Sequence, residues 1–122
     1  MKTLFAVLLF FSLQATAADT LHAYYFTTGT YSGTTRQYSD YTEQKTDIPV
    51  LFLQNKIKVG EGSYYILQQL PAGYENNYKV TRYSCSDNNE KHCTLEVLQG
   101  ETITLLWILY DKERVIIYYI NN

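Results

Sequence analysis

The stretch ETITLLWILYDKERVIIYYI, residues 101–120, contains two apolar runs that are separated by four charged residues. A helix needs about 20 mostly apolar residues to cross a bilayer, and the two runs, 103–110 and 115–120, are far shorter than that. Both are rich in Ile, Val, Leu and aromatic residues, and β-branched and aromatic residues favour strands. Two such runs around a short polar break predict a β-hairpin.

This hairpin is apolar on both of its faces. Leu105, Trp107 and Leu109 alternate with residues that are equally apolar, whereas a strand with one face in water alternates apolar with polar residues. The hairpin therefore needs cover on both sides, either in the centre of a sandwich or barrel or against a partner. We expect Trp107 to lie in the protein core, together with Leu105, Leu109 and Ile117.

The rest of the chain predicts further short strands and no helix. Turn signals such as Gly60-Glu61-Gly62 separate β-rich segments, and the segment 34–44 alternates weakly, as an exposed or edge strand does. The predicted strands span 20–28, 34–44, 47–55, 56–59, 63–70, 78–86 and 93–99. With the last hairpin, this pattern predicts an all-β fold: an antiparallel sandwich, immunoglobulin-like or similar, or a small barrel of about seven or eight strands.

The first 17 residues, MKTLFAVLLFFSLQATA, combine one lysine, an apolar run and an Ala-Thr-Ala site. This combination is typical of a cleaved secretory signal peptide, and an uncleaved anchor is the alternative. We therefore expect a single domain over 18–122 that is exported to the extracellular space or the periplasm.

Cys85 and Cys93 are the two cysteines of the chain, and they flank the polar segment SDNNEKH. Two cysteines in an exported protein usually pair, and antiparallel strands that leave this loop would bring the two side chains close. Closing a loop of roughly nine residues would stabilise the fold by about 2.5 kcal/mol. The sequence therefore predicts a disulfide. A redox or metal-binding thiol pair is the alternative, which this spacing does not favour.

Charge and motifs argue against several functions. The net charge is −2 and the charges are scattered, so the cationic footprint that nucleic acids or anionic lipids require is not evident. Neither His22 nor His92 stands in a catalytic motif, and Asp40 and Glu43 would point to opposite faces of a strand. We expect a protein that is not an enzyme, that uses no cofactor or metal, and whose mature chain does not insert into a membrane.

Thirteen tyrosines mark the chain. Most are expected to lie half-buried on strands, but tyrosine is also enriched at protein interfaces, and we expect partner contacts from Tyr24, Tyr38 and Tyr41. The leading hypothesis is a secreted protein-binding module, such as an inhibitor or a host- or envelope-facing factor, whose partner and oligomeric state the sequence does not name. A structural subunit of a surface assembly and a small-ligand carrier with an aromatic-lined interior are the alternatives.

Overall fold

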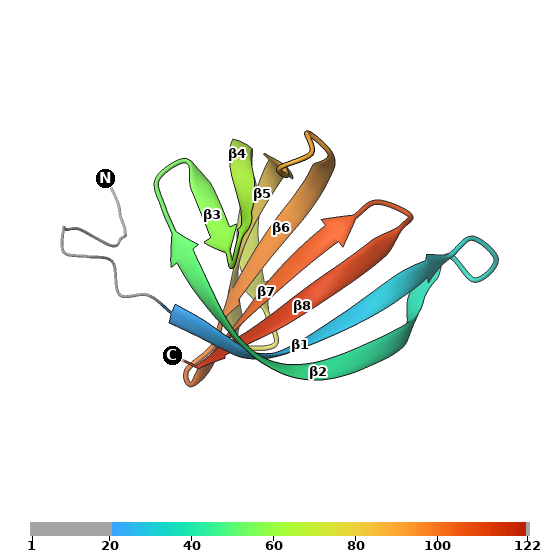
Figure 1. The fold of residues 1–122 in the computed structure, drawn as a ribbon, viewed down its shortest axis with the longest axis horizontal. Helices are drawn as coiled ribbons and strands as arrows, with labels where there is room; N and C mark the ends of the chain where they lie inside the picture. Colours follow the sequence, from blue (N-terminus) through green and yellow to red (C-terminus); the bar gives the residue numbers. More distant parts are fainter. Residues whose placement is uncertain (1–20, 122) are drawn as a thin grey trace.

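The computed structural model describes residues 21–121, whose strands close into one barrel (Figure 1). Each strand pairs antiparallel with the next along the chain, and the last strand pairs with the first. The strands are β1 (Leu21–Ser32), β2 (Gln37–Phe52), β3 (Lys56–Val59), β4 (Gly62–Glu75), β5 (Tyr78–Ser86), β6 (His92–Gln99), β7 (Ile103–Tyr110) and β8 (Arg114–Asn121). The predicted signal segment, residues 1–17, lies outside the described residues.

The all-β prediction is confirmed, and of the two predicted architectures the structure has the barrel. The ring closes because β1 pairs with β8 from Ala23, opposite Ile120, to Thr30, opposite Arg114. The β7–β8 hairpin thereby gains a neighbouring strand on each edge. Across residues 21–121 there is no helix that is long and apolar enough to span a membrane.

On β7, the three residues that were predicted to lie in the core face outward, and the residues between them form the core. Leu106 and Ile108 are fully buried and belong to the core cluster inside the barrel. Leu105, Trp107 and Leu109 are only half-buried, and the alternation along β7 turns them away from that cluster. Because both faces of the strand are apolar, its period of two residues could not indicate which face is the inner one.

Ile117 lies opposite Trp107 on the same outward side and is nevertheless buried, with 6% of its surface exposed. The outward side is therefore partly covered by the chain itself. One covering side chain is Tyr41, whose ring lies where a side chain on Gly29 would stand, 2.6 Å from an added Cβ. The β1–β2 hairpin, which carries both residues, extends beyond the barrel wall (Figure 1).

The strand β3 is the shortest of the ring, with only four residues. It pairs with β2 along Val50–Phe52 and with β4 along Gly62–Tyr65. Strands of a closed barrel are tilted and staggered, so this short strand cannot cover the long ones on either side. Among the described residues, 37–48 of β2 pair only with β1, and 67–75 of β4 pair only with β5.

The predicted disulfide is not present. Cys85 and Cys93 lie opposite each other in the β5–β6 ladder and both belong to the buried core, but they are free thiols beyond bonding distance. Each packs as a small apolar side chain, as unpaired cysteines commonly do. Burial raises the pKa of Cys85 to about 11 and that of Cys93 to about 12, so both remain protonated at neutral pH.

Candidate functional site

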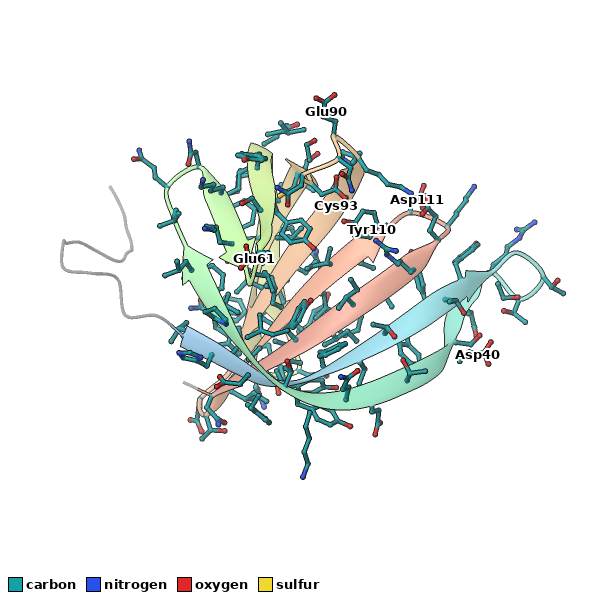
Figure 2. All side chains as sticks on the ribbon, in the orientation of Figure 1. Asp40, Glu61, Glu90, Cys93, Tyr110 and Asp111 are labelled. Carbon is teal, nitrogen blue, oxygen red and sulfur yellow. The ribbon has the colours of Figure 1, made fainter. Side chains whose placement is uncertain are left out.

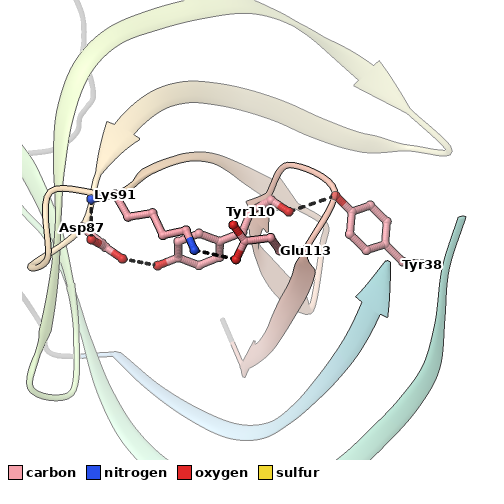
Figure 3. A network of polar contacts seen from close by, with 5 residues as sticks. All are labelled: Tyr38, Asp87, Lys91, Tyr110 and Glu113. Atoms are coloured by element: carbon pink, nitrogen blue, oxygen red, sulfur yellow. Dashed lines mark hydrogen bonds and ion pairs between the residues drawn. The ribbon is translucent and has the colours of Figure 1, made fainter. Parts of the chain in front are cut away.

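A polar network joins two turns at one end of the barrel (Figure 3). The hydroxyl of Tyr110 donates to Asp87 over 2.7 Å, and the hydroxyl of Tyr38 donates to the backbone carbonyl of Tyr110 over 3.3 Å. Lys91 and Glu113 form an ion pair alongside. Figure 2 shows Glu90 and Asp111 on the turns at this end of the barrel. The network therefore links β2 and the turns 87–91 and 111–113.

The electrostatics of this network suit a structural role. Desolvation alone would raise the pKa of Asp87, but hydrogen bonds from Tyr110 and from the backbone of Lys91 and Asn89 outweigh it and lower that pKa. Burial raises the pKa of Tyr110, and it raises the pKa of Tyr64 to about 12. Efficient proton transfer needs a group that titrates near the working pH. The shifts here move these groups away from neutrality.

The histidines contact single partners. His22 Nδ1 lies 2.8 Å from Asp47, and His92 Nε2 lies 2.8 Å from the hydroxyl of Ser84. The second contact pairs a nucleophile with a base, but the contacts of the described residues give His92 no carboxylate to orient it, as a catalytic dyad requires. Among residues 21–121, no three His, Cys, Asp or Glu side chains gather in a way that could hold a metal ion.

Two open hollows occur at the surface. One of about 500 Å³ lies between the β4–β5 and β6–β7 turns, and is lined by residues 76–78 and 100–103. The other, of about 390 Å³, lies beside the polar network and includes His92, Glu96 and Asp111 in its lining. Fully buried side chains such as Leu95 pack inside the barrel, so neither hollow is the aromatic-lined interior expected of a small-ligand carrier.

The three tyrosines predicted to bind a partner do not form one surface. Tyr24 and Tyr41 are exposed, at 41% and 48%, but Tyr41 lies against Gly29, which is roughly 15 Å further along β1 than Tyr24. Tyr38 is half-buried and its hydroxyl is engaged in the polar network. Exposure of a single aromatic residue is ordinary, so a second feature is needed to identify a binding surface.

The exposed apolar side chains gather elsewhere, around the β2–β3 turn and the first half of β4. Four of the seven large hydrophobic side chains that are exposed among residues 21–121 lie there. We call them the β3 patch: Phe52 at 36%, Leu53 at 39%, Tyr65 at 43% and Leu67 at 62% exposure. The sequence indicates strands for these residues but does not show which neighbours cover their side chains, so the patch could not be predicted from it.

Backbone hydrogen bonds hold the patch together. The amide of Leu53 donates to the carbonyl of Lys56, which closes the turn, and the amide of Ile66 donates to the carbonyl of Asn55; both distances are 2.9 Å. The second bond places the turn directly beside the point at which β4 loses its pairing with β3. The exposed apolar residues therefore surround the start of the free edge of β4.

The two free edges of the barrel differ in charge. Charged side chains on an edge strand discourage pairing with another chain. The free part of β2 carries four of them: Asp40, Glu43, Lys45 and Asp47. The free part of β4 carries one, Glu75 at its far end, which forms an ion pair with Arg82, and Pro71 limits the length over which this edge could pair.

Two lysines flank the β3 patch. Lys56 lies opposite Tyr65 in the β3–β4 ladder, with its Nζ 5.6 Å from the centre of the Tyr65 ring, and Lys58 lies opposite Ser63. Neither lysine forms an ion pair within the described part of the chain. Lys56 and Lys58 thus place two positive charges beside the patch, in a protein whose net charge is −2.

Comparison of the chain with protein-family models, with curated proteins and with solved structures found no match.

Proposed function

We propose that this protein is a secreted, non-enzymatic module that binds another protein through the β3 patch and the adjoining free edge of β4. The observation that carries the proposal is the convergence of Phe52, Leu53, Tyr65 and Leu67 around an uncharged strand edge. Exposed apolar side chains that flank a strand edge on both of its faces can be covered by a partner, and an uncovered strand edge offers that partner backbone hydrogen bonds.

The rival functions have less support. A small-ligand carrier is expected to enclose a cavity, whereas a cluster of buried side chains occupies the barrel interior. An enzyme is expected to hold a base or acid with a matched pKa, whereas Asp87, Tyr64 and Tyr110 are shifted away from neutrality. A structural subunit of a surface assembly would use the same free edge, and self-association distinguishes it.

The proposal is tested by comparing two double variants as bait in the native fluid or host extract. Leu53→Ser with Leu67→Ser removes the most exposed aliphatic part of the patch. Tyr24→Ser with Tyr41→Ser is the matched control, because these side chains are similarly exposed but lie on other strands. Circular dichroism verifies that both variants fold. We expect the proteins that copurify with the wild type to fall at least tenfold with the patch variant and to persist with the control.

The opposite result, partners lost with the tyrosine control and retained with the patch variant, would move the binding surface to the β1–β2 hairpin. A partner that is retained equally by both variants would exclude both surfaces.

A further inference from the structure

We infer that the partner segment is an extended, partly apolar strand with acidic side chains, which adds to β4 along Gln68–Leu70, next to the exposed Leu67. This inference rests on the proposed function, because it specifies the partner that the β3 patch and the free edge would take.

The backbone geometry favours an added strand over a helix or a flat surface. In an edge strand, about half of the backbone N–H and C=O groups point away from the neighbouring strand. Here β5 occupies one side of β4, and β3 occupies the other side only as far as Tyr65, after which Ile66 donates to Asn55 of the turn. A new strand would take the position in the sheet that β3 leaves open, as in other cases of strand addition.

The apolar side chains of the patch stand on both faces of this position. Phe52 lies opposite Ile57, whose side chain is buried in the core, so Phe52 belongs to the inner face at the open end of the barrel. Tyr65 follows the inward-facing Tyr64 and lies opposite Lys56, so it belongs to the outer face. An extended strand presents alternate side chains to both faces and could contact both aromatic residues, whereas a helix laid on the sheet would reach only one.

Pro71 and irregular pairing limit the length of β4 along which a partner strand could pair. Pro71 has no N–H to donate, and the β4–β5 register is irregular between Leu70 and Gly73. The register is also irregular between Ile66 and Gln68, where Leu67 has no partner on β5, so the regular free edge runs from Gln68 to Leu70. A partner segment would need only a few residues in register, with specificity supplied by the aromatic and cationic side chains next to it.

The charge beside the edge favours an acidic segment from another protein over a second copy of this chain. Lys56 and Lys58 have no ion-pair partner in the described part of the chain. The free edge of β4 has no acidic residue from Leu67 to Tyr74, so pairing with the same edge of a second copy would leave both lysines without a counter-charge. Complementary charge at an interface speeds encounter and selects partners.

The experiment selects peptides from a random displayed library against the mature protein and measures their affinity for purified variants. We expect sequences in which apolar residues alternate with Asp or Glu. N-methylation removes a backbone donor, and we expect it to weaken binding at least tenfold at alternate peptide positions and little at the positions between them. The change Lys56→Glu with Lys58→Glu is expected to weaken binding at least tenfold, and the control Lys112→Glu, on the β7–β8 turn at another part of the surface, less than twofold.

Three outcomes would overturn the inference. Binding that maps to the β3 patch but tolerates N-methylation at every position would exclude strand addition and leave the proposed function intact. A basic consensus, or concentration-dependent dimerisation that Leu67→Lys abolishes, would replace the acidic segment with another partner or with a second copy. Failure of the library to yield any peptide whose binding depends on Leu67 would exclude a short linear segment, while the bait experiment above would still test the patch itself.

Discussion

At the scale of single residues, Tyr110 carries most of the polar connections at the end of the barrel. Its side chain is 2% exposed, and its hydroxyl bonds to Asp87. We expect Tyr110→Phe to lower the free energy of unfolding by about 1–2 kcal/mol at pH 7, because a hydrogen bond to a carboxylate is lost but solvent still reaches Asp87. Urea denaturation measures this difference.

The pH dependence of that difference has a definite sign. Hydrogen bonding lowers the pKa of Asp87 in the folded state, so its stabilising contribution is present above the unfolded pKa of 3.8 and is lost as the pH falls through the lower folded value. The difference in the free energy of unfolding between wild type and Tyr110→Phe should therefore become smaller below about pH 4. A gap that stays constant down to pH 2 would contradict the role given to the Asp87–Tyr110 bond.

The two thiols give a second prediction at this scale. Burial raises the pKa of Cys85 to about 11 and of Cys93 to about 12, and the thiolate is the reactive form. Both groups should react negligibly with a disulfide reagent at pH 8 in the native protein. Two equivalents should react once the protein is denatured without reductant. Denatured protein in which neither thiol reacts would restore the disulfide that the sequence predicted.

Trp107 and Leu106 are neighbours that should respond differently to truncation. The indole Nε1 of Trp107 is shielded from solvent and has no hydrogen-bond partner in the described residues, and an unsatisfied polar group is costly. Replacement by Phe removes this cost, so Trp107→Phe should destabilise by less than about 1 kcal/mol. Leu106 is fully buried inside the barrel, and Leu106→Ala should cost about 2–5 kcal/mol. Chemical denaturation measures the free energy of unfolding of both variants. An equal loss of stability in the two would contradict the outward assignment of Trp107.

At the scale of the elements, local sequence located some strands well and ended others too early: the strands predicted over 20–28 and 63–70 continue to Ser32 in β1 and to Glu75 in β4. The predicted strands 56–59 and 78–86 and the first strand of the last hairpin agree with β3, β5 and β7. The predicted strands 34–44 and 47–55 form the single strand β2, because pairing with β1 continues through the polar middle of this segment despite its irregularities. The strand propensity of single residues does not indicate this pairing between distant segments, so the sequence predicted two strands instead of one.

The free edge of β4 has a dynamic consequence. Amides that are hydrogen bonded on only one side of a sheet region belong to its less stable parts. Hydrogen exchange should therefore be faster for residues 67–75 than for Ile103–Tyr110, which lies between two full partners. Mass-spectrometric exchange on peptides from the two strands measures this. Equal protection would show that the edge of β4 is covered in solution.

At the scale of the whole molecule, ring closure and the proposed site arise together. The sequence predicted the strands and the need to cover both faces of residues 103–120, but closure depends on the stagger between strands that are distant in the chain. The β3 patch depends on the same stagger, since Leu67 is exposed where the four residues of β3 end. In the sequence, the only indication of this site is the short strand 56–59 between two longer ones. The predicted binding residues Tyr24, Tyr38 and Tyr41 lie on β1 and β2 instead.

Site-specific photo-crosslinking tests the proposed binding surface most directly. A photoreactive phenylalanine analogue is placed at Leu67, or at Tyr41 as the control, and the exported protein is irradiated in its native fluid. The proposal predicts a defined crosslinked product from position 67, identified by mass spectrometry as a different protein attached through an extended segment, and none from position 41. Crosslinks from position 41 with none from position 67 would contradict it.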